Sequence, residues 1–160
     1  MSDWGVSGLT VRYGRRTALD DVTLDVPAGA VTAVIGGDGA GKTTLLRALA
    51  GVARPTSGTV RSPARRRIGY VAGASGLYDD LTVAENVAFV AGAYGVRGAE
   101  LEVRLAELLE RTGLDGIGGR LAGRLSGGMR QKLAFALAML HRPARPGSRR
   151  PARCAGRTAP

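Results

Sequence analysis

At 160 residues, the chain is long enough for one domain with a sizeable core and too short for two comfortable ones. Its 44% apolar and 22% charged residues are typical of a soluble globular protein, and no run approaches the roughly 20 apolar residues of a membrane span. The single cysteine, Cys154, excludes an internal disulfide, and the first residues lack a secretory signal pattern, so we expect a cytoplasmic protein.

The formal net charge of +10 is concentrated at the C-terminal end. Residues 142–160 hold six arginines and no acidic residue, so more than half of the excess positive charge lies in 19 residues. Four of these residues are proline, and none is Val, Ile, Leu, Phe, Tyr or Trp. Segment 143–160 is therefore predicted to be a disordered tail. A tail that binds nucleic acid or an anionic membrane is the alternative.

Three strands, a glycine-rich loop and a helix are predicted in the N-terminal part. Residues 7–13 and 21–26 alternate apolar and polar side chains, which indicates half-buried strands. Residues 31–35 form a nearly continuous apolar run, typical of a strand buried on both faces of a mostly parallel sheet. The glycine-rich loop follows, and residues 42–50 are predicted to form a helix that ends at Gly51.

Short strands are expected at 58–61 and 68–72, and helices dominate after them. The helix predicted over 82–93 opens on the capping-box spacing Thr-x-x-Glu. Two more helices are predicted over 99–112 and 126–141, because leucines recur at helical spacing in both segments. The leucines expected to face inward are Leu101, Leu105, Leu108, Leu109, Leu133, Leu137 and Leu140.

The strongest chemical signal is the sequence Gly-Gly-Asp-Gly-Ala-Gly-Lys-Thr, which has the P-loop spacing G-x-x-x-x-G-K-[ST] between a strand and a helix. Its glycines let backbone N–H groups approach phosphate oxygens, and the helix N-terminus adds partial positive charge. Lys42 supplies a mobile charge for the β- and γ-phosphates, Thr43 is placed to bind Mg²⁺, and Thr44 adds a hydroxyl. The predicted phosphate-binding residues are Gly36, Gly37, Asp38, Gly39, Ala40, Gly41, Lys42, Thr43 and Thr44.

The residues around this loop resemble the ATPase subunit of ABC transporters. Tyr13 lies about thirty residues before Lys42, where an aromatic side chain of the family stacks on adenine. Leu-Ser-Gly-Gly-Met-Arg-Gln-Lys at 125–132 resembles the signature motif of the family, with Met129 where glutamine is commoner. The resemblance implies that the signature holds the γ-phosphate bound to the P-loop of a second subunit, through Ser126, Gly127 and Gly128.

The resemblance covers about residues 6–142 and implies an α/β fold. A P-loop NTPase-type core with an antiparallel N-terminal β part and a helical subdomain at about 80–130 is expected, missing its C-terminal half. The implied ligands are ATP and Mg²⁺. The implied partners are a transmembrane permease and a second nucleotide-binding subunit in a head-to-tail dimer, without nucleic acid.

Asp79 to Asn86 matches the family segment that contacts the membrane-spanning partner, which implies a location at the inner face of the cell membrane through that permease. Segment 77–82 and Gly128-Met129 look like the exporter-type branch.

The hydrolytic residues of the family are missing from this chain. Tyr70-Val71-Ala72 leads into Gly73 where the family has a glutamine, and the last acidic residue, Asp115, precedes the signature, so no Walker B Asp-Glu follows it. The only histidine, His141, stands at the end of the signature helix, where helix capping is its expected role. No catalytic residue is therefore predicted.

Residue types change abruptly near residue 143, and we interpret residues 1–142 as a partial nucleotide-binding domain followed by a frameshifted tail. A buried strand at 31–35 without its neighbours predicts a marginal, aggregation-prone fold. Three functional hypotheses stand: a truncated ATP-binding subunit, a non-hydrolysing nucleotide-binding module and a nucleic-acid-binding protein with a basic tail. ATP turnover distinguishes the first two, and deletion of the tail tests the third.

Overall fold

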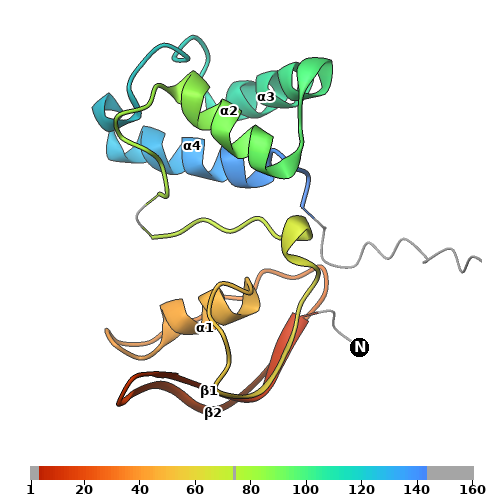
Figure 1. Ribbon diagram of the computed structural model, residues 1–160, viewed down its shortest axis with the longest axis vertical. Helices are drawn as coiled ribbons and strands as arrows, with labels where there is room; N and C mark the ends of the chain where they lie inside the picture. Colours follow the sequence, from red (N-terminus) through yellow and green to blue (C-terminus); the bar gives the residue numbers. More distant parts are fainter. Residues whose placement is uncertain (1–3, 74, 144–160) are drawn as a thin grey trace, which may run out of the picture. The chain divides into compact units, whose positions relative to one another are not determined.

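The computed structural model describes residues 4–73 and 75–143, which form two compact units. The first unit extends to Ser62, and the second runs from Pro63 to Pro143. The first holds three strands and one helix, and the second holds three longer helices (Figure 1). The α/β fold with an antiparallel N-terminal β part is confirmed. The predicted disordered tail, from residue 144 on, lies outside the described residues.

The first unit is an antiparallel sheet with a helix packed on it (Figure 1). Strand β1 (Trp4–Tyr13) lies between β2 (Arg16–Val26) and β3 (Ser57–Arg61), and helix α1 spans Lys42–Leu49. The predicted strands at 7–13, 21–26 and 58–61 and the helix after the loop are thus confirmed. The buried core joins sheet and helix through Val6, Leu9, Val11, Leu19, Leu45, Ala48 and Leu49.

Strand β2 begins five residues earlier than predicted, because an irregularity in the strand hides its alternation. The register with β1 shifts between the pairs Leu9–Val22 and Val11–Leu19. Asp21 lies there with a positive φ of 48°, a conformation that aspartate tolerates better than most residues. Its backbone N–H donates to the Thr10 hydroxyl at 3.1 Å, which satisfies a polar side chain that is buried.

The predicted strands at 31–35 and 68–72 are wrong, since neither segment has strand structure. Val31 is 100% exposed and Ile35 is 93% exposed. A strand exists only as part of a hydrogen-bonded ladder, and among the described residues nothing pairs with these two segments. The apolar run therefore contributes exposed apolar surface, and the tendency to aggregate stays a prediction.

The second unit is a helical cluster around one core (Figure 1). Helices α2 (Val83–Tyr94), α3 (Gly98–Thr112) and α4 (Gly127–Met139) confirm the three predicted helices, and short 3₁₀ turns lie at Arg65–Arg67 and Ala122–Arg124. In the described part of the chain, every helix is too short or too polar to cross a membrane. The buried core consists of Val83, Val87, Ala91, Val96, Leu114, Ile117, Leu125, Leu133, Leu137 and Leu140, and the predicted leucines of α3 pack against it.

Asn86, on α2, is the buried polar residue that holds the preceding loop. Its side chain is 1% exposed, and its Oδ1 accepts a hydrogen bond from the Tyr78 backbone N–H at 2.9 Å. Its Nδ2 donates to the backbone carbonyls of Tyr78, Leu81 and Thr82. The loop over 78–82 is therefore tied to the helix by one buried amide group, which bonds to four of the loop's backbone groups.

We expect Asn86→Ala to lower the free energy of unfolding by about 1–3 kcal/mol, because the Tyr78 backbone N–H loses its acceptor and the loop loses the donor that links three of its carbonyls to α2. Urea unfolding monitored by circular dichroism measures the change. Ala93→Ser, at an exposed position of the same helix, serves as the control and should stay within about 0.5 kcal/mol of the wild type. Equal stabilities of Asn86→Ala and the control would contradict this role.

His141 does not cap α4, contrary to expectation. Its ring stacks on Tyr94 with centroids 3.9 Å apart and an interplanar angle of 8°. Neither ring nitrogen forms a geometrically acceptable hydrogen bond, and the Leu140 carbonyl at the helix end accepts instead from Arg104 Nη1 at 3.0 Å. Burial lowers the pKa of His141, the nearby Ile68 carbonyl partly opposes this, and the charge of Arg104 adds to the lowering.

A lowered histidine pKa predicts that stability falls as the medium is acidified. Because the unfolded chain takes up a proton near pH 6.5 and the folded chain only at lower pH, the melting temperature should drop below about pH 6.5. His141→Phe keeps a stacking ring without titration, so its melting temperature should stay flat between about pH 7.5 and 5.5. Glu85, whose pKa is lowered by its hydrogen bonds to Thr82, affects stability only below 4.5. A wild type that melts at higher temperature on acidification would contradict the prediction.

Candidate nucleotide-binding site

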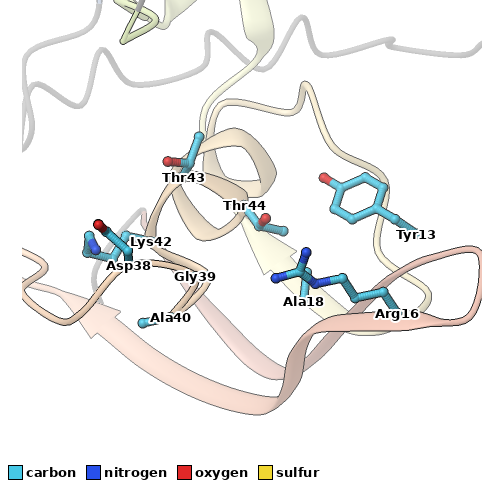
Figure 2. A pocket seen from close by; sticks show the side chains of 10 residues that line it. Tyr13, Arg16, Ala18, Asp38, Gly39, Ala40, Lys42, Thr43 and Thr44 are labelled. Carbon is cyan, nitrogen blue, oxygen red and sulfur yellow. The ribbon is translucent and has the colours of Figure 1, made fainter.

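The glycine-rich loop and the β1–β2 hairpin together enclose a cavity of about 470 Å³ in the first unit (Figure 2). This size falls in the range of small-molecule sites, and both polar and aromatic side chains face it. The cavity is lined by Tyr13, Arg16, Ala18, Asp38, Gly39, Ala40, Gly41, Lys42, Thr43 and Thr44. Eight of these ten are predicted site residues, while Arg16 and Ala18 are new.

Gly41 allows the glycine-rich loop to pack closely against strand β2 at the start of α1. It is the N-cap residue of the helix, with a φ of 86° that favours glycine. A Cβ there would lie 2.5 Å from the Ala18 carbonyl oxygen and 2.7 Å from Leu19 Cδ2. Only a residue without a side chain allows the helix N-terminus to approach β2 so closely. The approach sets the free N–H groups of α1 beside the cavity.

Lys42 lies across the loop that it follows in sequence. Its Nζ donates to the backbone carbonyls of Gly36 at 2.8 Å and Gly37 at 2.7 Å. The Thr43 hydroxyl side chain is exposed, and Thr44 is half-buried. A positive charge, two hydroxyls and a helix N-terminus thus surround one cavity, which suits an anion with several oxygens.

The β1–β2 hairpin brings an aromatic ring and an arginine to the opposite wall of the cavity (Figure 2). Tyr13 and Arg16 are cross-strand partners that flank the two-residue turn Gly14-Arg15. The Tyr13 side chain is 51% exposed, so its ring is free to accept another planar group. Sequence reasoning named Tyr13 and missed Arg16, although a two-residue turn after Tyr13 would have paired these two positions.

The signature residues lie in the second unit, so they do not line this cavity. Ser126 is the N-cap of α4, and its hydroxyl accepts a hydrogen bond from the Met129 backbone N–H at 3.3 Å. Gly127 and Gly128 are exposed in the first helical turn, with open space where a Cβ would stand. Their predicted contact with a nucleotide of a second subunit stays a prediction.

Comparison with known proteins agrees with these motifs. The family described as ABC transporter matches residues 19–144. This chain belongs to the ABC transporter family. A spermidine/putrescine import ATP-binding protein of Nitrosospira multiformis is 38% identical over 147 residues, and a sulfate/thiosulfate import ATP-binding protein of Mycobacterium bovis is 40% identical over 143 residues. These matches cover 86% and 84% of this chain, and 40% and 41% of the two relatives.

Solved structures of ABC proteins share the fold. An ATP-binding subunit of an ABC transporter superposes with a TM-score of 0.76 at 32% identity, over 88% of this chain and 62% of that structure. A dimeric bacterial ABC transporter cassette superposes with a TM-score of 0.73 at 28% identity, over 88% of this chain and 70% of that structure. The chain thus spans about two fifths of the length of the curated relatives it matches. Both relatives are named as import proteins, and the exporter-type interpretation of 77–82 and Gly128-Met129 stays a prediction.

Gly41→Ala should destabilise the first unit by about 2–4 kcal/mol, because the new methyl group collides with the Ala18 carbonyl and the backbone has a positive φ. Gly37→Ala is the matched control, since nothing lies within 4 Å of a Cβ at that position. Thermal unfolding of both variants without nucleotide measures the difference. Equal melting temperatures for the two variants would show that the close approach of α1 to β2 is not required.

Proposed function

We propose that this chain is an ATP-binding subunit of an ABC importer and holds Mg-ATP in the cavity of its first unit. The observation that carries the proposal is the set of groups around that cavity, namely a glycine loop, a helix N-terminus, Lys42 and an accessible Tyr13 ring. The family membership and the import function of its relatives support it.

Each group has a distinct part in holding the nucleotide. The Tyr13 ring stacks on adenine, and the loop N–H groups and Lys42 bind the β- and γ-phosphates. The Thr43 hydroxyl would bind Mg²⁺, which neutralises phosphate charge when bound. The positive φ of Gly39 (79°) and Gly41 (86°) fits this use, because glycine adopts this left-handed backbone without strain and lets the loop turn its N–H groups toward an anion.

The second unit would provide the contacts to partners. Signature residues Ser126, Gly127 and Gly128 are exposed at the N-terminus of α4, where they suit the phosphate of a nucleotide on a second subunit. Tyr78 and Phe89, 51% and 55% exposed, meet edge to face with ring centroids 4.9 Å apart. This aromatic pair suits the membrane-spanning permease, which would bring the chain to the inner face of the membrane.

A second candidate function is nucleotide binding without hydrolysis. The sequence holds no acidic residue after Asp115 and no glutamine other than Gln131, so the groups that position the attacking water are not supplied by this chain. We therefore expect Mg-ATP binding with no measurable turnover by the chain alone. Steady phosphate release above the rate in the absence of protein would overturn this second candidate and favour the first.

Lys42→Ala should raise the Kd for Mg-ATP about 30-fold or more, because a charge-assisted contact to phosphate contributes about 2 kcal/mol. Isothermal titration calorimetry measures the affinity. The only other lysine, Lys132, lies exposed on α4, so Lys132→Ala is the matched control and should leave the Kd within about twofold. An unchanged Kd in Lys42→Ala would contradict the assignment of the loop as the phosphate site.

A further inference from the structure

We infer that Arg16 is a phosphate-binding residue of the nucleotide site, which binds the phosphate chain from the side opposite the glycine loop. The inference rests on the proposed function and adds a residue to its site. Arg16 lies outside the segment 36–44 and outside the signature, and no motif of the sequence points to it.

The hairpin determines where Arg16 stands. Tyr13 and Arg16 are directly opposite each other in the β1–β2 register, and directly opposite residues of an antiparallel pair project to the same face of the sheet. Both side chains line the cavity, so the base-binding ring and the guanidinium are adjacent on one wall. A nucleotide with its base on Tyr13 would therefore have Arg16 on the same wall of the cavity as its base.

The guanidinium reaches the middle of the glycine loop. In Figure 2 the Arg16 side chain extends from the hairpin toward the loop. Its Nη2 lies 3.8 Å from the position that a Cβ on Gly39 would occupy. A ligand beside Gly39 therefore meets hydrogen-bond donors from two sources. The loop backbone offers N–H groups, and the planar guanidinium of Arg16 offers five N–H donors.

Arg16 is available for a ligand. Its side chain is exposed and, among the described residues, forms no hydrogen bond or ion pair, whereas Arg104 and Arg130 each bind a carboxylate and a backbone carbonyl of the second unit. The cavity lining contains one carboxylate, Asp38, and two basic residues, Arg16 and Lys42. A di- or triphosphate supplies acceptors for the free N–H donors of Arg16. The planar guanidinium can bond two phosphate oxygens at once, which the ammonium group of a lysine does less well.

The full-length chain is titrated with two probes in the presence of Mg²⁺: ATP and inorganic tripolyphosphate, which has no base or ribose. We expect Arg16→Ala to weaken the binding of both probes by a similar factor of about ten. Arg16→Lys should weaken the binding of both probes less than Arg16→Ala does, because lysine keeps the positive charge but lacks the planar guanidinium. Arg15→Ala is the matched control, since Arg15 is an exposed arginine one residue away that does not line the cavity, and it should change both affinities less than twofold.

Two outcomes would overturn the inference while the proposed function stands. If Arg16→Ala weakens the binding of ATP but not that of tripolyphosphate, the guanidinium contacts the base and not the phosphates. If Arg15→Ala weakens the binding of both probes as much as Arg16→Ala does, the affinity depends only on the overall charge of the protein and not on the position of Arg16. A wild type that binds neither probe overturns the proposed function and the inference together. Among the described residues the Arg16 guanidinium forms no hydrogen bond or ion pair, so the melting temperature of Arg16→Ala should equal that of the wild type. If Arg16→Ala fails to fold, Arg16→Gln replaces it.

Discussion

The candidate site depends on the close approach of Gly41 to strand β2. The backbone there is left-handed, and the Ala18 carbonyl occupies the space that any Cβ would need. This contact sets the N-terminus of α1 against the hairpin and brings Lys42 and Thr43 to the same cavity as Tyr13. Residues nearly thirty positions apart in sequence thus become neighbours because a single glycine removes a steric barrier. The buried core that includes Leu9, Leu19 and Leu45 stabilises the packing of α1 on the sheet.

In the second unit, the satisfaction of buried polar groups organises the structure. The Asn86 amide holds the loop before α2, and Arg104 takes the carbonyl at the end of α4. The His141 ring, displaced from the helix end, packs on Tyr94 and is left without a geometrically good hydrogen bond. The partial burial of this ring lowers the pKa of His141.

Membership of the ABC transporter family and the cavity geometry point to the same chemistry in different ways. The family match identifies the motifs over most of the chain, and the structure supplies a cavity in which nucleotide-binding groups meet. The glycine loop and Lys42, Thr43 and Thr44 are contiguous in sequence, whereas an Asp-Glu pair after the signature is not among these 160 residues. Arg16 adds a second positively charged side chain to the lining of the cavity, beside Lys42.

The sequence by itself determined the features that are encoded within a few residues. The P-loop pattern, the capping box of Thr82 and Glu85 and the leucine faces of the helices were all predicted, because each depends on neighbours three or four positions away. Tertiary structure alone decided that 31–35 and 68–72 form no strand, that β2 begins at Arg16, and which residues form the far wall of the cavity. An apolar run such as 31–35 becomes a strand only when another segment offers a hydrogen-bonded edge, and in the described residues none does. Arg16, likewise, enters the site only through cross-strand register, and Asn86 meets its four backbone partners only once the loop has folded over α2. Which distant segments pair depends on the tertiary structure as a whole, so the pairing cannot be predicted from a local sequence pattern.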